Sequence, residues 1–327
     1  MEPNDELKEM ATVDAEAGED ISVKPRKRLK ELIERGRNCI LVGPPGTGKT
    51  KLVLDARDDL ESLNDLGEFK LVQFHREFSY QDFIDGYKPT ETGFAYQPGV
   101  FRQFLEAVEK RRDTDGDEKK IDLFAIDEIN RANVSSVFGE VLTILDDPER
   151  KQVIPPRSGM PLVLYDSVMI LGTMNSADKS IALVDFALRR RFSFVFVPPD
   201  YDGLRAWLLE YGFEFSEFSI EDYVNAISQL NERIEMHPRL GKEMTLGQSF
   251  FVPKKKEKAP ITLREIAETL SEEAFPQVEA YFGRGSYREM DQILAPNIRQ
   301  KITGADQITE EDIVGLIRVL NADQASA

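Results

Sequence analysis

The chain has 327 residues, of which 41% are apolar and 31% are charged, which suffices for a packed core and roughly two domains of ordinary size. A formal net charge of −17 argues against a protein whose whole surface grips nucleic acid. No apolar run approaches the roughly 20 residues of a membrane-spanning helix, so we expect no membrane association. The single cysteine, Cys39, excludes internal disulfides and fits a cytoplasmic protein, and with only two histidines the chain is a poor candidate for a zinc site.

Residues 1–22 are rich in Glu, Asp and Ala and lack apolar periodicity, which predicts a disordered acidic leader or the remnant of a linker. The pattern then alternates between helical and strand-like segments. Five short apolar runs indicate buried strands; they lie at 39–42, 69–74, 121–126, 168–172 and 192–197. We therefore predict an α/β domain over residues 23–199, a three-layer sandwich with a five-stranded parallel sheet between helices.

The strand signals fade after Pro198-Pro199, and amphipathic helices are predicted at 223–234 and 263–270. We expect a small helical lid domain over residues 200–321, followed by a short tail at 322–327. Two basic stretches, 24–37 and 254–258, are interpreted as solvated surface, with nucleic-acid contact as the alternative.

A glycine-rich motif follows the first predicted strand and precedes a helical run. It matches G-x-x-x-x-G-K-[ST], and its residues are Gly43, Pro44, Pro45, Gly46, Thr47, Gly48, Lys49 and Thr50. Such a loop wraps consecutive backbone N–H groups around phosphates at the positive end of a helix. Lys49 is expected to reach the β and γ phosphates, and the Thr50 hydroxyl to bind Mg²⁺. The motif predicts a P-loop nucleoside triphosphatase.

Two carboxylates end the apolar strand predicted at 121–126, as in a Walker B element. Asp127 is expected to hold Mg²⁺ through its water shell, while Glu128 orients and activates the water that attacks the γ-phosphate. A surface strand can end in acids without any catalytic role. Downstream of a phosphate loop, the pair indicates hydrolysis.

The next strand ends in Met174-Asn175-Ser176-Ala177-Asp178. In a P-loop sheet this strand lies beside the Walker B strand, so Asn175 is the candidate sensor of the γ-phosphate or of the attacking water. Asp178 is expected to position either that water or an incoming arginine. The structural alternative for Asn175 is an Asx turn that closes the strand.

Three consecutive arginines, Arg189, Arg190 and Arg191, separate an apolar helix predicted at 181–188 from the last strand. Guanidinium groups stabilise charge on a transferring phosphoryl group, and in ring-shaped motors the neighbouring subunit supplies them. We predict Arg189 and Arg190 as finger residues that act across a subunit interface. The alternative is a basic turn that contacts solvent or nucleic acid.

Several segments together resemble the McrB family of AAA+ proteins. Residues 127–133 and 137–141 resemble the family's Walker B region, and 184–194 resemble its finger segment. The Met-Asn-Ser-Ala-Asp segment is similar to the family signature Met-Asn-Thr-Ala-Asp and differs at Ser176. The Leu-Gly-Gln-Ser-Phe-Phe segment at 246–251 resembles a lid motif that commonly carries His where this chain has Gln248. The resemblance spans about residues 25–285.

This resemblance implies an AAA+ fold with a helix-2 insertion, expected as a hairpin at about 83–100 that faces a ring pore or a partner, or has no function. It also implies GTP rather than ATP as the nucleotide, a homo-oligomeric ring that is expected to be hexameric, a separate McrC-like endonuclease and a defence role against modified foreign DNA. Family members carry a DNA reader before the motor, for which the leader is too short. DNA contact is therefore expected to be indirect or through the ring pore.

Two other functions stay open at this point. A MoxR-like, ATP-driven remodelling chaperone shares the fold and the Walker B neighbourhood. A nucleotide-gated assembly scaffold would form the same ring with little intrinsic turnover. Phosphate-loop residues contact phosphates and not bases, so the residues leave GTP and ATP as alternatives.

Overall fold

A computed structural model of the chain describes residues 24–90, 93–115, 119–146, 152–155, 158–178, 186–255, 258–283, 287–304 and 308–324. The leader predicted at 1–22 lies outside these ranges. Contacts divide the chain into two compact units: Met1–Val42 with Lys49–Phe196, and Gly43–Gly48 with Val197–Ala327. The phosphate loop thus groups with the C-terminal unit, and the assignment of the units as nucleotide-binding and lid domains stays a prediction. Within the described ranges, no helix has both the length and the apolar character needed to cross a bilayer.

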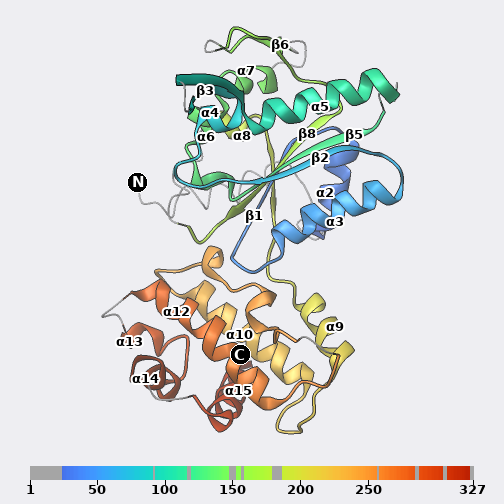
Figure 1. The fold of residues 1–327 in the computed structure, drawn as a ribbon. Coiled ribbons are helices and arrows are strands. Elements are labelled where there is room, and N and C mark those ends of the chain that lie inside the picture. The colour runs from blue at the N-terminus through green and yellow to red at the C-terminus, as the bar shows by residue number, and fades with distance from the viewer. Residues whose placement is uncertain are drawn as a thin grey trace. The chain divides into compact units, whose positions relative to one another are not determined.

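The first unit is built on a five-stranded parallel sheet (Figure 1) with the order β2-β5-β8-β1-β9. Its strands are β1 (Cys39–Gly43), β2 (Leu66–Gln73), β5 (Ile121–Asp127), β8 (Val168–Asn175) and β9 (Ser193–Phe196). Strand β1 is buried along its whole length, as expected when helices cover both faces of a parallel sheet. All five predicted strands are present, and the predicted α/β fold is confirmed.

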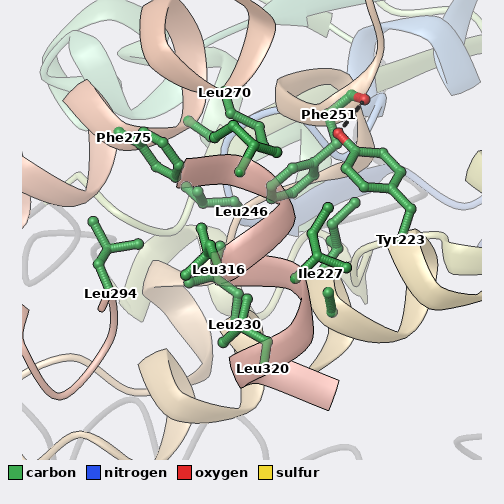
Figure 2. Close-up of a cluster of buried hydrophobic side chains, with 14 of the residues drawn as sticks. Tyr223, Ile227, Leu230, Leu246, Phe251, Leu270, Phe275, Leu294, Leu316 and Leu320 are labelled. Atoms are coloured by element: carbon green, nitrogen blue, oxygen red, sulfur yellow. Dashed lines mark hydrogen bonds between the residues drawn. The ribbon is translucent and has the colours of Figure 1, made fainter. Parts of the chain in front are cut away.

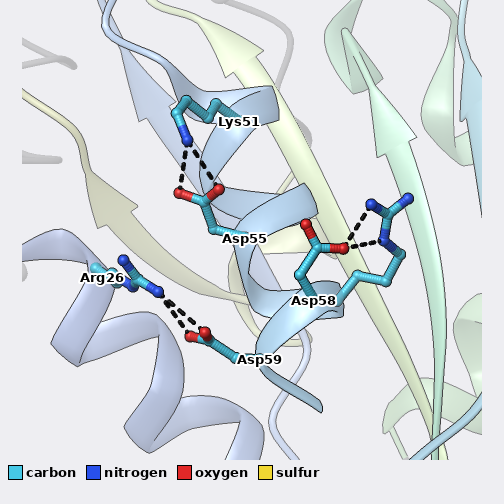
Figure 3. Close-up of polar contacts among 6 residues, drawn as sticks. Arg26, Lys51, Asp55, Asp58 and Asp59 are labelled. Atoms are coloured by element: carbon cyan, nitrogen blue, oxygen red, sulfur yellow. Dashed lines mark hydrogen bonds and ion pairs between the residues drawn. The ribbon is translucent and has the colours of Figure 1, made fainter. Parts of the chain in front are cut away.

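Helices cover both faces of this sheet (Figure 1). Helix α5 (Val100–Asp115) packs on β2 and β5 from one side, while α2 (Pro25–Glu34) and α3 (Lys49–Ser62) lie on the other. Arg26 of α2 donates to both carboxylate oxygens of Asp59 on α3, at 3.0 Å each (Figure 3). This basic stretch therefore meets acids of its own chain.

A β-hairpin of β3 (Asp85–Thr90) and β4 (Gly93–Pro98) stands where the insertion was predicted. The short helix α4 (Tyr80–Phe83) leads into it and buries Phe83, whose ring stacks on Phe101 with centroids 4.8 Å apart. At the hairpin base, the buried Asp85 accepts hydrogen bonds from Arg102 at 2.7 Å and Ser158 at 2.6 Å. The hairpin is therefore held by its base and by aromatic packing.

A second, unpredicted hairpin pairs β6 (Gln152–Val153) with β7 (Leu162–Val163). Strands of two residues are too short to produce a recognisable apolar period. The remaining short elements of the first unit are η1 (Ile129–Arg131), α6 (Val134–Phe138), α7 (Val141–Asp146) and α8 (Phe186–Arg189). The start of the helix predicted at 181–188 lies outside the described residues.

The second unit is helical beyond the phosphate loop. Its elements are α9 (Tyr201–Tyr211), α10 (Ile220–Met236), η3 (Lys242–Met244), η4 (Gln248–Phe251), α11 (Leu263–Thr269), η5 (Leu270–Ala274), α12 (Phe275–Phe282), α13 (Tyr287–Met290), α14 (Pro296–Gly304) and α15 (Glu310–Gln324). Helices α10 and α15 contribute the core side chains Ile227, Leu230, Leu316 and Leu320 (Figure 2). Each large apolar side chain buried in this way contributes roughly 1.5–3 kcal/mol.

A buried polar contact fixes the segment around η4 to this core. The hydroxyl of Tyr223 donates to the carbonyl oxygen of Phe251 at 3.1 Å (Figure 2). Near this segment, the described lysines of the basic stretch 254–258 meet acids of the same unit: Lys255 lies 3.1 Å from Glu265, and Lys258 lies 2.6 Å from Glu210. Lys258 is exposed, as expected of solvated surface, whereas the side chain of Lys255 is only 8% exposed, so the expectation of solvent was wrong for Lys255.

The start of α15 generates a prediction about acid stability. Burial by itself raises the pKa of Asp312, but hydrogen bonds from Lys301 and Thr309 outweigh it and lower the pKa from 3.8 to about 2. Because the folded-state pKa lies below the unfolded one, the carboxylate stabilises the fold above about pH 4, and this stabilisation is lost as the pH falls toward 2. We expect Asp312→Asn to lower the free energy of unfolding by about 1 kcal/mol at neutral pH, measured by urea denaturation.

The difference between Asp312→Asn and wild type should shrink below about pH 4. Glu311→Gln, at an exposed neighbouring position, is the control and should stay near wild type throughout. A deficit for Asp312→Asn that does not depend on pH would contradict this account of the helix start.

Candidate functional site

The phosphate loop has the backbone that an anion cradle requires. Gly46 and Gly48 have φ values of 77° and 84°, in the left-handed region that only glycine adopts at little cost. Between them the buried Thr47 donates its hydroxyl to the carbonyl oxygen of Pro44 at 3.1 Å. Pro44 and Pro45 carry no N–H, so the first run of consecutive donors in the loop comes from Gly46, Thr47 and Gly48.

The predicted metal-binding residues meet in the first unit. Thr50, in the first turn of α3, donates its hydroxyl to Oδ1 of Asp127 at the end of β5, at 2.8 Å. A hydroxyl and a carboxylate oxygen are the hard ligands that Mg²⁺ prefers. The donor set that the structure brings together therefore fits this ion, with Thr50 and Asp127 as the residues that would hold it or its water shell.

Lys49 lies beside the same acids. Burial disfavours the charged ammonium and lowers the pKa of Lys49 from 10.5 to about 8, although Glu128 and Asp127 act in the opposite direction. A largely buried cation next to the end of an anion cradle is suited to bind a phosphate, whose charge would favour the ammonium form.

Glu128 has an unusual backbone conformation. Its φ of 54° and ψ of 47° are left-handed, a conformation that costs free energy in a residue other than glycine and occurs preferentially at functional sites. The turn gives the two adjacent acids different surroundings. Oε2 of Glu128 accepts a hydrogen bond from Nε of Arg131 at 3.3 Å, whereas Asp127 faces the hydroxyl of Thr50.

Thr173 on β8 connects the two acids and was not predicted. Its hydroxyl donates to Oδ1 of Asp127, and the hydroxyl oxygen of Thr173 accepts the N–H of Glu128 at 3.2 Å. Strand β8 lies beside β5 in the sheet, as predicted. The sequence feature that could have identified Thr173 is a hydroxyl side chain near the end of the apolar strand that follows the Walker B strand.

The predicted sensor segment follows Thr173. Asn175 is the last residue of β8, and its Oδ1 accepts the N–H of Ala177 at 3.1 Å. This contact is the Asx turn that the sequence offered as the structural alternative. The backbone N–H of Asp178 points back to the carbonyl of Asn175 at 3.4 Å. The roles of Asn175 and Asp178 toward a γ-phosphate stay predictions.

The three arginines have different surroundings. Arg191 donates from Nε to the carbonyl oxygen of Leu142 on α7 at 2.7 Å, so it is tied to its own chain. Arg189 is partly buried at the end of α8, and Arg190 is exposed. In the part of the chain that the structure describes, the side chain of Arg190 makes no hydrogen bond or ion pair. Arg189 also interacts within the chain, so the surroundings distinguish Arg190 alone from Arg191, and the finger roles of Arg189 and Arg190 stay predictions.

The chain is similar to proteins of known families. The family model of the AAA domain (dynein-related subfamily) matches residues 38–192. The chain is 33% identical over 281 residues to the EcoKMcrB subunit of a type IV methyl-directed restriction enzyme of Escherichia coli (strain K12), covering 81% of this chain and 59% of that subunit. It is 29% identical over 202 residues to component YdiS of the type II restriction enzyme BsuMI of Bacillus subtilis (strain 168), covering 49% of this chain and 57% of that component.

The position of Thr173 generates a prediction about the stability of the site. Replacing Thr173 with Val keeps the shape of the side chain but removes the hydroxyl, which leaves the N–H of Glu128 and Oδ1 of Asp127 without this partner. We expect the free energy of unfolding to fall by about 1–3 kcal/mol, measured by urea denaturation. Thr173→Ser, which keeps the hydroxyl, should lose less; equal losses for Val and Ser would mean that packing, and not the hydroxyl, matters.

Proposed function

We propose that this chain, whose residues 38–192 match the AAA domain (dynein-related subfamily) and which is similar to an McrB subunit, hydrolyses GTP with Mg²⁺ in an oligomeric ring that drives a partner endonuclease. The observation that carries the proposal is the contact between Thr50 and Asp127, with Lys49 and Glu128 beside it. A P-loop NTPase needs these groups together, because phosphoryl transfer depends on positioning and charge stabilisation. Mg²⁺, held by Thr50 and Asp127, would supply charge neutralisation on the β and γ phosphates.

The other steps of phosphate binding and hydrolysis are assigned to individual residues of the chain. Lys49 binds the β and γ phosphates. Glu128 orients the attacking water and accepts its proton, after its carboxylate leaves Arg131. Asn175 senses the γ-phosphate and Asp178 positions the water or the incoming arginine. The strained backbone of Glu128 supports this assignment, since such strain persists where the surroundings hold a functional side chain in place.

The test of the proposal is phosphate release by the purified chain with GTP and with ATP, alone and with a candidate nuclease subunit. Glu128→Gln keeps the shape of the side chain but removes the base, so we expect turnover to fall by about 10²–10⁴-fold while nucleotide affinity is retained. Glu106→Gln, an exposed site on α5, is the control for the loss of one charge. Turnover retained in Glu128→Gln would remove this residue from the base role, and no turnover by wild type with any nucleotide would sink the proposal.

The ring places a catalytic arginine of one subunit in the site of the next. Arg190→Ala and Glu128→Gln should therefore each be nearly inactive alone, because a finger arginine contributes about 10³–10⁵-fold. In a 1:1 mixture, about a quarter of the interfaces would combine an intact Glu128 with an intact Arg190 from its neighbour. We expect phosphate release to return in the mixture, measured under conditions that allow subunits to exchange.

Arg191→Ala provides the matched control for the mixing experiment. Its guanidinium binds the Leu142 carbonyl of the same chain, so its defect is internal and a finger donated by a neighbour cannot replace it. Activity that returns with Arg191→Ala as readily as with Arg190→Ala, or a mixture with Arg190→Ala that stays inactive although both variants bind nucleotide and assemble, would refute the shared site.

The nuclease partner and the preference for GTP are what the resemblance to the McrB family implies, and the names of two relatives support only a role in restriction. Both are named as parts of restriction enzymes, and the chain spans less than two thirds of the length of either. We propose a cytoplasmic, hexameric ring that works with an McrC-like endonuclease in restriction of foreign DNA, with DNA contact indirect or through the ring pore.

Two alternatives make different predictions. A MoxR-like remodelling chaperone would bind ATP tightly and GTP weakly, which a nucleotide competition measurement decides. A nucleotide-gated scaffold would assemble with a non-hydrolysable analogue, seen by size-exclusion chromatography, yet release negligible phosphate even with its partner.

A further inference from the structure

Three consecutive carbonyl groups of the phosphate loop accept hydrogen bonds from one short segment, Gly247–Gln248–Ser249. The N–H of Gly247 donates to the carbonyl oxygen of Pro45 at 2.9 Å, and the N–H of Ser249 to that of Gly46 at 3.1 Å. The side-chain Nε2 of Gln248 donates to the carbonyl oxygen of Thr47 at 3.0 Å. Loop and segment belong to the same compact unit.

These contacts with the carbonyl groups also determine the direction in which the N–H group of each peptide points. A peptide group is planar and trans, so its C=O and its N–H point in opposite directions. The carbonyls of Pro45, Gly46 and Thr47 share their peptide planes with the N–H groups of Gly46, Thr47 and Gly48. Holding the three carbonyls on the 247–249 side therefore turns these N–H groups away from it, and they are the consecutive donors that the loop offers an anion.

The approach is close enough to require glycine at position 247. A Cβ added to Gly247 would lie 2.0 Å from the carbonyl carbon of Gly46 and 2.2 Å from the nitrogen of Thr47. These are backbone atoms, which cannot move aside as a flexible side chain can. The segment is thus shaped to the loop over several residues.

Gln248 supplies the one side chain among the three contacts, and it uses both ends of its amide. While Nε2 donates to Thr47, Oε1 accepts the backbone N–H of Asp200 at 3.1 Å. The second bond orients the amide so that its donor, and not its acceptor, faces the loop. A side chain that only accepts could satisfy Asp200 but would set an oxygen against the carbonyl of Thr47.

We propose that Gln248 is a positioning residue for phosphate binding. It holds the Thr47–Gly48 peptide so that the Gly48 N–H faces the anion, and it does so from the C-terminal unit without touching the nucleotide. The inference rests on the proposed function in one respect, that Gly43–Gly48 binds the phosphates. The inference adds Gln248 to the residues that determine phosphate binding, and it predicts that the affinity of the loop for phosphate depends on the segment 247–249.

The test uses the full chain and a probe without a base, Mg²⁺-tripolyphosphate, whose Kd is measured by calorimetry beside those of GTP and ATP. Gln248→Glu keeps the shape and the acceptor for Asp200 but loses the donor to Thr47. We expect its Kd for tripolyphosphate to rise about tenfold or more. Gln248→His, which can both donate and accept through its ring nitrogens, should recover most of the affinity. Gln292→Glu, an exposed amide-to-acid change in the same unit, is the matched control.

Thermal unfolding without ligand separates a loss of fold from a loss of positioning. If Gln248→Glu is unstable, the comparison of Gln248→His with Gln248→Ala, which has neither a donor nor an acceptor, carries the test, and only His should bind the probe well. Wild-type affinity in Gln248→Glu, or equal affinities in His and Ala, overturns the inference while nucleotide binding by wild type upholds the proposed function. Wild type that binds neither the nucleotides nor tripolyphosphate overturns the proposed function instead.

Discussion

Two hydroxyl groups converge on one carboxylate oxygen of Asp127, that of Thr50 from α3 and that of Thr173 from β8. The chemistry of the first unit depends on this convergence, because it brings the start of a helix and the ends of two neighbouring strands to one point. Glu128 joins through its backbone N–H, which Thr173 accepts. The carboxylate therefore orders the residues around it, and these hydroxyls are also groups that a bound Mg²⁺ can use.

Two buried carboxylates of the first unit, Asp122 and Asp85, each accept hydrogen bonds from several donors. Asp122 on β5 is fully buried and accepts hydrogen bonds from Arg111 at 3.0 Å, Ser167 at 2.7 Å and the N–H of Glu68 at 2.7 Å. The buried carboxylate of Asp85 likewise accepts hydrogen bonds from Arg102 and Ser158. Removing one partner from such a pair leaves a desolvated charge, which is far more costly than the pair's net contribution to stability. These pairs hold the Walker B strand and the base of the first hairpin.

Each unit contains backbone conformations that are unfavourable for most residues. Glu128 is left-handed without being glycine, and the loop from Gly43 to Gly48 turns its peptide groups through two left-handed glycines. The loop's carbonyls then need partners of their own, which the segment 247–249 provides. Because the C=O and N–H of each peptide point in opposite directions, N–H groups that face an anion require hydrogen-bond partners for the carbonyls on the other side of the loop.

The sequence by itself determined the five strands and predicted Thr50 and Asp127 as partners at one metal site, and the family resemblance supplied the hairpin expected at about 83–100. Apolar period, glycine spacing and the order of a P-loop sheet are local or topological, so they can be read along the chain. The tertiary structure alone decided that Thr173 bridges the acids, that Arg191 and not Arg190 is tied to Leu142, and that Gln248 holds Thr47. These contacts join residues far apart in the chain. A single hydroxyl, guanidinium or amide side chain belongs to no repeating pattern in the sequence, so its partner cannot be predicted from its position. The strands β6 and β7 were not predicted, because two residues are too few to show the alternation of apolar and polar side chains that indicates a strand.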